Sequence, residues 1–223
     1  MTILVVAAHP DDEVLGCGGT VARHTAAGDV VHILIVSEGA TSRDDPSAGD
    51  VGKLRDSARA AAQALGAEPP ILSGFPDNRL DSMDRLDVIK EVERHIDTIE
   101  PHTVYTHHGG DLNIDHRIVH EVVITACRPL PGSPVKRIFS FEAVSSTECS
   151  SAAIGAPFLP VRHVDISSFM DLKMNALTFY ESEMRPFPHP RSMEAVRAQA
   201  TFRGSQVGFH AAEAFQTELD LSF

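Results

Sequence analysis

The sequence has no tryptophan, only three cysteines and no long uninterrupted apolar run. Cys17, Cys127 and Cys149 lie far apart without a Cys-x-x-Cys pair, so neither a disulfide framework nor a structural zinc knuckle is indicated. This favours a reducing, cytoplasmic location. Because the chain also shows neither a basic leader followed by an apolar stretch nor a run that could cross a bilayer, we expect no export signal and no membrane partner.

Positive charge is scarce as well, with 19 Lys and Arg residues against 31 Asp and Glu residues and a formal net charge of −12. Nucleic-acid binding requires clustered Lys and Arg to neutralise phosphates, so we expect no nucleic-acid partner. A small polar or cationic molecule fits this charge better, and the composition leaves a homo-oligomer open. With 223 residues, 43% of them hydrophobic, the chain is expected to form one domain around a sizeable core.

Polar residues that can carry chemistry follow directly after the first apolar run. Residues 3–7 read Ile-Leu-Val-Val-Ala, which is typical of a buried parallel strand, and residues 8–13 read Ala-His-Pro-Asp-Asp-Glu. In open α/β sheets, ligands bind just beyond the carboxyl ends of the strands. We therefore expect His9, Asp11 and Asp12 at the rim of an active site.

This short motif favours a metal site. His9 and Asp12 are three residues apart and can share one cation, with Asp11 free beside them. Mixed nitrogen and oxygen ligands suit zinc, whose catalytic sites use three protein ligands and a water, so one more ligand must come from elsewhere. The alternative is that Asp11 and Asp12 only cap a helix at Glu13, but capping does not explain His9.

A nucleotide cofactor is a weaker interpretation of the same region. Gly16, Gly18 and Glu38 imitate part of a dinucleotide fingerprint. However, the third glycine position holds Val21, and the five residues His-Pro-Asp-Asp-Glu stand between the strand and Gly16. The fingerprint requires its glycines directly after the strand, so we do not expect this cofactor.

The missing ligand is predicted in a second polar cluster, residues 107–116, which follows the fourth expected strand. Apolar residues then recur on one helix face over 119–126, so His116 falls in the first turn of a helix that Asp115 can cap. His116 should then point to the rim, and Asp115 is a candidate to orient one of the histidines. His120, one turn further on, is expected in a supporting or core position.

Four further side chains are candidates for substrate contact. Arg55 stands on an expected helix in which Leu54, Ala58, Ala61 and Leu65 recur at helical spacing. It could reach a substrate hydroxyl or phosphate, although the sequence pattern alone favours a solvated helix arginine. Asp77 follows the short third strand and could bind sugar hydroxyls or form an Asx turn. His189 and Arg191 lie in a proline-stiffened loop, residues 184–192, which could finish a pocket or be a plain surface connection.

Three motifs together resemble those of the PIG-L/LmbE-like zinc-dependent N-deacetylases. They are residues 8–13, Gly16-Cys17-Gly18-Gly19, and Asn113-Ile114-Asp115-His116, and the likeness extends over roughly the first 130 residues. The resemblance implies one catalytic Zn²⁺ held by His9, Asp12 and His116, with Asp11 as general base. Several members have histidine where this chain has Asn113, whose amide can donate to an oxyanion but cannot shuttle a proton.

We therefore expect a single α/β domain over residues 1–223, with a mainly parallel, Rossmann-like sheet flanked by helices. Strands at 135–141 and 161–166 and a helix at 169–180 are expected in the last third, and residues from about 130 on should form one wall of the pocket. The resemblance implies hydrolysis of an N-acetyl group on an amino sugar or sugar-containing small molecule. The alternatives are the same chemistry on a larger conjugate or antibiotic intermediate, and a non-catalytic sugar- or metal-binding relative.

Overall fold

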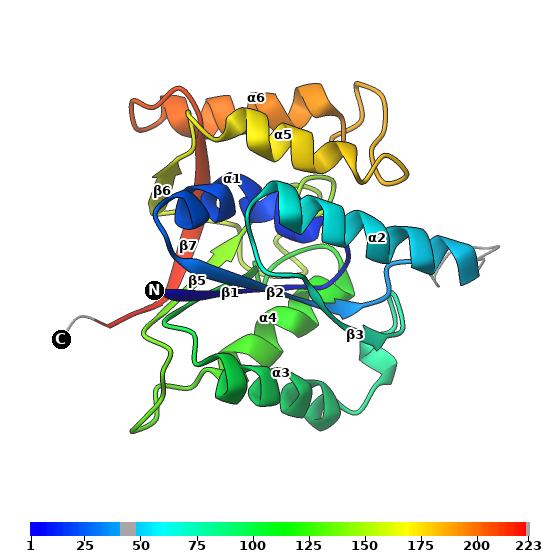
Figure 1. The fold of residues 1–223 in the computed structure, drawn as a ribbon, viewed down its shortest axis with the longest axis vertical. Helices are drawn as coiled ribbons and strands as arrows, with labels where there is room; N and C mark the ends of the chain where they lie inside the picture. The colour runs from blue at the N-terminus through cyan, green and yellow to red at the C-terminus, as the bar shows by residue number, and fades with distance from the viewer. Residues whose placement is uncertain (41–47, 222–223) are drawn as a thin grey trace.

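The computed structural model describes residues 1–40 and 48–221, and within them seven strands form one sheet between two layers of helices (Figure 1). The strand order is β3-β2-β1-β4-β5-β7-β6. The strands are β1 (Thr2–Ala7), β2 (Val30–Ser37), β3 (Ile71–Phe75), β4 (Thr103–His107), β5 (Arg137–Phe141), β6 (Arg162–Asp165) and β7 (Ala212–Asp220). The first five run parallel, and β7 is antiparallel to both of its neighbours, so the predicted mainly parallel α/β fold is confirmed.

The helices divide between the two faces of the sheet, as Figure 1 shows. They are α1 (Asp12–Ala26), α2 (Ala48–Ala64), α3 (Arg85–Ile99), α4 (Ile114–Ala126), α5 (Met170–Thr178) and α6 (Met193–Ser205). Helices α1, α2, α5 and α6 lie above the sheet in this view, and α3 and α4 lie below it. In the part of the chain that the structure describes, none of the helices combines the length and the apolar character needed to cross a membrane.

Strand β1 shows why its apolar run is uninterrupted. Successive side chains of a strand point to opposite faces, so Ile3 and Val5 pack into the core under α1 and α2, while Leu4 and Val6 pack into the core over α3 and α4. A strand that is covered on both faces has no side chain in water, so it needs no polar residue on either face. The burial of β1 on both faces therefore follows directly from residues 3–7.

The last third of the chain follows the expectation only in part. In the last third, β5, β6 and α5 form where they were expected, but α6 and β7 were not predicted. Helix α6 presents few buried residues and β7 is buried mainly in its first half, so neither shows a clear period in the sequence.

A buried ion pair joins this last third to the first helix. Lys173 of α5 donates to Glu213 of β7 at 2.6 Å and to the carbonyl oxygen of Leu15 at 2.8 Å. Glu213 also accepts from the backbone amides of Gly19 and Thr20 in α1. Both charged side chains are at most 4% exposed. The pair therefore fixes α5 and β7 against the helix that begins at the rim.

We expect Lys173→Met to lower the free energy of unfolding by about 3–5 kcal/mol, because it leaves the Glu213 carboxylate buried without its cation. Denaturant unfolding measures the change. Lys53→Met is the matched control: the Lys53 side chain is 82% exposed and its Nζ lies 3.7 Å from Asp50, so its loss should cost at most about 1 kcal/mol. Equal losses in the two variants would contradict the buried role of Lys173.

Candidate metal centre

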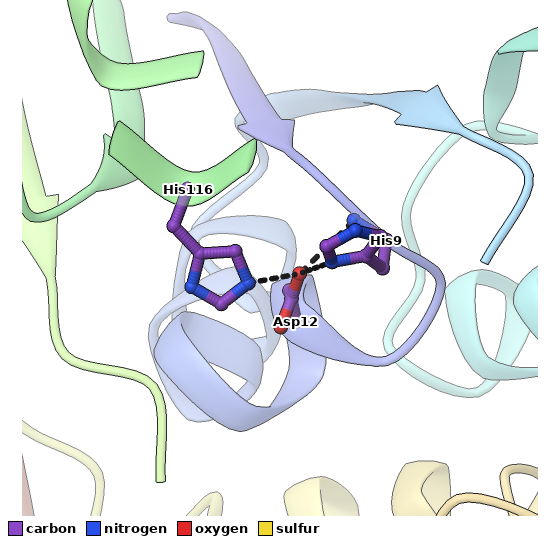
Figure 2. A group of neighbouring side chains, drawn as sticks. All are labelled: His9, Asp12 and His116. Atoms are coloured by element: carbon purple, nitrogen blue, oxygen red, sulfur yellow. Dashed lines mark hydrogen bonds and ion pairs between the residues drawn. The ribbon is translucent and has the colours of Figure 1, made fainter. Parts of the chain in front are cut away.

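Three predicted ligands meet where β1 and β4 end. The two strands are parallel neighbours, so the turn into α1 and the first turn of α4 lie at the same edge of the sheet. Suitable atoms of His9, Asp12 and His116 all lie within 4.8 Å of one another. Figure 2 shows both imidazoles turned toward the Asp12 carboxylate, whose Oδ2 is 3.2 Å from His9 Nδ1 and 3.2 Å from His116 Nε2.

The electrostatics of this group centre on Asp12. Burial alone would raise the pKa of its carboxyl, but the His116 and His107 rings hold that pKa well below its usual value. Burial conversely disfavours a charged His116, yet the carboxylates of Asp12 and Asp111 raise its pKa to about 9. The ionised form of Asp12 is thus stabilised by the neighbouring imidazoles, and a divalent cation at this position would also stabilise it.

The unpaired polar atoms also fit a cation. Within the described residues, Asp12 Oδ1 and His116 Nε2 are buried without a hydrogen bond of good geometry. Leaving such atoms unpaired costs free energy, and two imidazoles with one carboxylate form a donor set that zinc accepts. The residues present therefore fit a single bound zinc ion.

Carboxylates behind the ligands hold the rings in place. His9 Nε2 lies 3.2 Å from Asp115 Oδ2 and 3.2 Å from Asp77 Oδ1, and His116 Nδ1 lies 3.2 Å from Asp111 Oδ1. A metal-binding histidine commonly donates its other N–H group to a carboxylate in this way, which fixes the tautomer and the orientation of the ring. Each histidine can then present its remaining nitrogen to Asp12.

The cap of α4 differs from the prediction. Asn113, not Asp115, is the N-cap, and its side chain accepts from the backbone amide of Asp115 at 2.8 Å. Asp115 instead turns inward, where its Oδ1 accepts from the backbone amide of Leu80. The second carboxylate oxygen is thereby left for His9, so the cap prediction is wrong while the contact with a histidine is present.

Asp11 lies beside the ligands in a conformation that few non-glycine residues adopt, with φ at 112°. Its backbone amide donates to Glu13 Oε2, and Tyr180 of the last third donates to Glu13 Oε1 at 2.6 Å. Burial raises the pKa of the Asp11 carboxyl well above its usual value, and the Arg191 guanidinium opposes that shift. Asp11 is thus poised near the ligands in a fixed backbone turn.

The four expected substrate contacts fall at different distances from this centre. Arg191 reaches the centre, because its Nη1 donates to Asp11 Oδ2 at 2.8 Å. The expectation that Asp11 is free of partners is therefore wrong. Asp77 is buried against His9. Arg55 is about half exposed and lies 3.8 Å from Glu38, and His189 is exposed, its Nδ1 accepting from the backbone of Arg191. The structure thus brings Arg191 and Asp77 to the ligands.

Sequence reasoning missed two members of the cluster. The His107 ring stacks on His116 with centroids 3.9 Å apart and accepts from the backbone amide of Ala8. Asp111, which contacts His116, accepts from Ser146 and Thr147 of a later loop. Both residues stood within the polar cluster 107–116, but only pairing across the sheet shows which of its side chains turn inward.

The chain is similar in sequence to one protein family and to several deacetylases. The family described as PIG-L, GlcNAc-PI de-N-acetylase, matches residues 4–127, just over half of the chain. The uncharacterized deacetylase YaiS of Escherichia coli (strain K12) is 31% identical over 133 residues, covering 58% of this chain and 69% of the relative. A 1D-myo-inositol 2-acetamido-2-deoxy-alpha-D-glucopyranoside deacetylase of Rhodococcus opacus (strain B4) is 26% identical, covering 83% and 82%.

Two solved structures share the whole fold. The N,N'-diacetylchitobiose deacetylase of Pyrococcus horikoshii superposes with a TM-score of 0.79 at 21% identity, covering 98% of this chain and 84% of that one. The 4-carboxy-2-hydroxymuconate hydratase GalB of Pseudomonas putida KT2440 also gives 0.79, at 20% identity, covering 100% and 98%. Because the names of these two proteins describe different reactions, the shared fold does not by itself select one.

Proposed function

This chain belongs to the PIG-L family of GlcNAc-PI de-N-acetylases, and we propose from that premise that it hydrolyses an N-acetyl group on an amino sugar or a sugar-containing small molecule. The products would be acetate and a free amine. The observation that carries the proposal is the buried group of His9, Asp12 and His116 at the strand ends, with the Asp11 carboxylate beside it. The cytoplasm, suggested by three unpaired cysteines, would be its location.

In this proposal His9, Asp12 and His116 hold one zinc ion, although the same donors would accept iron(II), cobalt or nickel. A bound zinc ion would lower the pKa of a water molecule and polarise the amide carbonyl. Asp115, Asp77 and Asp111 would keep the histidine rings oriented through their other nitrogens.

Asp11 is proposed as the general base. Its carboxylate would take a proton from the attacking water and return it to the leaving amine. This role requires the carboxylate to lie within hydrogen-bond reach of the attacking water and of the amine. The contacts with Glu13 and Arg191 support this role, because they fix the backbone and one carboxylate oxygen of Asp11. Arg191 also offers a cation next to the base, where it can orient the substrate.

We further propose that the chain acts as one domain over residues 1–223, in which residues beyond about 130 form one wall of the pocket. Arg191 and Tyr180 support this, since both reach the turn that carries Asp11. Asp77, Arg191, Arg55 and His189 are proposed to contact the substrate. Asp77 and Arg191 are the stronger candidates because they already adjoin the ligands.

Asn113 is proposed to donate to the oxyanion, and the test must separate this role from capping. Asn113→Ser retains an oxygen that caps α4 but lacks the amide donor, which in the structure donates to Asn78 Oδ1 at 2.9 Å. We expect turnover to fall on the order of a hundredfold with little change in KM. Asn113→Ala should in addition lose about 1 kcal/mol of stability with the cap.

Steady-state kinetics and thermal unfolding of the two variants measure these effects. Asn113→His completes the series, because a titratable donor at this position should add or shift a limb of the pH–rate profile. If Asn113→Ser turns over substrate at the wild-type rate, the Asn113 amide does not donate to the oxyanion. His189 would then be the first donor to examine.

The function itself is tested by acetate release from a panel of N-acetylated sugars with the zinc-loaded protein. Turnover of N-acetylglucosamine or its glycosides would support the proposal. Turnover only of larger conjugates would favour an amidase acting on those molecules. Binding of sugar and zinc without acetate release from any substrate would favour a non-catalytic relative.

A further inference from the structure

A turn early in the connection between β5 and β6 places two hydroxyl groups behind the metal centre. Residues 142–161 form this connection without a helix or strand. Ser146 donates to Asp111 Oδ1, and Thr147 donates to Asp111 Oδ2 at 2.6 Å. Strands β4 and β5 are parallel neighbours, so the loops that follow them meet at one edge of the sheet. Neither hydroxyl belongs to a motif of the sequence or has a role in the proposed reaction.

The direction of the Thr147 contact is fixed by the turn itself. The backbone amide of Ala143 donates to Thr147 Oγ1 at 2.9 Å, and the backbone amide of Thr147 donates to the carbonyl oxygen of Ala143 at 2.9 Å. A threonine hydroxyl has one proton to donate, and the amide of Ala143 can only donate. The hydroxyl proton is therefore left for the Asp111 carboxylate, which in its ionised form can only accept.

Asp111 has both carboxylate oxygens engaged, and it contacts one of the predicted ligands. Its Oδ1 accepts from Ser146 and from the backbone amide of Asn113 at 2.8 Å, and its Oδ2 accepts from Thr147. Oδ1 also lies 3.2 Å from His116 Nδ1. Asp111 and His116 are fully buried, and neither hydroxyl residue is more than 9% exposed. Because donors on both oxygens fix the plane of the carboxylate, they also fix the direction from which it meets the His116 ring.

The loop has other contacts that attach it to the connection between β4 and α4. Ser150 donates to the carbonyl oxygen of Gly110 at 2.6 Å, and His108 Nε2 donates to that of Ala156 at 2.9 Å. A Cβ atom on Gly110 would lie 2.1 Å from the Ala156 oxygen, so the two backbones are in close contact there. Since these contacts already attach the loop, the two hydroxyls on Asp111 are best explained by their effect on its carboxylate.

The orientation of His116 matters because its two nitrogens face different groups. Nε2 lies 3.2 Å from Asp12 Oδ2, while Nδ1 faces Asp111. A carboxylate that holds the second nitrogen of a metal-binding histidine fixes the ring, and its loss typically lowers metal affinity roughly 10- to 100-fold. A ring that is already fixed loses less conformational entropy when it binds an ion. Donors that immobilise Asp111 should therefore raise metal affinity through that residue.

We propose that Ser146 and Thr147 are positioning residues for the metal centre, which hold Asp111 and through it the imidazole of His116. The inference rests on the proposed function only in taking His116 as a zinc ligand. It deepens that function by giving the connection between β5 and β6 a part in zinc binding. It does not depend on which amide or sugar is hydrolysed.

The zinc affinity of the purified protein, measured by competition with a chelator, tests this role. We expect Ser146→Ala to lower the affinity severalfold, and the double variant with Ser146→Ala and Thr147→Val to lower it about tenfold or more. Thr147→Ser keeps the hydroxyl and should keep the wild-type affinity. Ser150→Ala is the matched control, because this hydroxyl of the same loop donates to the carbonyl oxygen of Gly110 and not to a carboxylate. It should leave the affinity unchanged.

A mutant cycle with Asp111→Ala separates positioning from a general effect on the loop. If the hydroxyls act through the carboxylate, the double variant should lose about tenfold in the wild-type background and little in the Asp111→Ala background. Equal losses in both backgrounds would overturn the proposal, as would wild-type zinc affinity in the double variant. If the Asp111→Ala or the double variant does not fold, Ser146→Ala and Ser150→Ala decide, and equal affinities in these two would overturn the proposal.

Acetate release from N-acetylated sugars is measured with the same proteins, so that failure of this inference and failure of the proposed function are distinguished. Lower zinc affinity in the double variant, with no acetate release even from the wild type, would support the positioning role and contradict the proposed function. Acetate release from the wild type, with unchanged zinc affinity in the double variant, would support the proposed function and overturn the positioning role.

Discussion

Asp11→Asn is expected to retain its metal and lose about 100- to 10,000-fold in kcat, the range that a positioned general base contributes. The substitution keeps the size of the side chain, and asparagine tolerates positive φ better than most residues, so the backbone at 112° should be preserved. The backbone amide can still donate to Glu13. The loss should therefore reflect the missing proton acceptor rather than a rearranged turn.

Steady-state kinetics and metal analysis on the same preparation check this result. Asp171→Asn is the matched control, because its carboxylate is 96% exposed on α5 and pairs only at the surface with Arg197. That variant should keep its turnover. If Asp11→Asn turns over substrate at the wild-type rate, another group must take the proton, and the role proposed for Asp11 is wrong.

The second large effect concerns the metal. Loss of a residue that only holds a metal ligand in place typically lowers metal affinity by roughly 10- to 100-fold. We expect His9→Ala, Asp12→Ala and His116→Ala each to lower zinc affinity by more than this. Asp115→Asn, which weakens only the contact with His9 Nε2, should fall within that smaller range. Competition with a chelator measures the affinities. Added zinc should raise the melting temperature of the wild type and fail to do so in the three ligand variants.

His120→Ala is the matched control on the same helix. Its Nδ1 lies 2.8 Å from the carbonyl oxygen of His107, so the ring supports the strand end and does not face Asp12. We expect nearly full zinc affinity in this variant. Loss of zinc in His120→Ala together with retention in His116→Ala would reverse the assignment of α4.

Much of the centre could be predicted because its residues are local in the sequence. His9, Asp11 and Asp12 follow one strand directly, and His116 follows another by one loop, so the rule for parallel strand ends places them at one edge. The family resemblance drawn from these motifs is confirmed. The proposed ligand and base roles remain predictions that the variants above address.

The rest depends on contacts that no short motif encodes. Tyr180 and Arg191 reach the Asp11 turn from more than 160 residues away. Strand β7 enters the sheet between β5 and β6 in the antiparallel sense, a choice that its nine residues do not reveal. The cap of α4 was assigned to Asp115 instead of Asn113, because either side chain can cap a helix and only the contact of Asp115 with the backbone of Leu80 distinguishes them.

The position of β7 also governs the order in which the molecule can assemble during synthesis. Strand β6 pairs with β7 alone, so residues 162–165 cannot join the sheet until residues 212–220 have emerged from the ribosome. Until then β5 remains an open edge, which can pair with another chain. The first five strands, being consecutive and parallel, can form earlier around β1. The nascent chain is therefore most exposed to misassembly in the interval between the synthesis of β5 and that of β7.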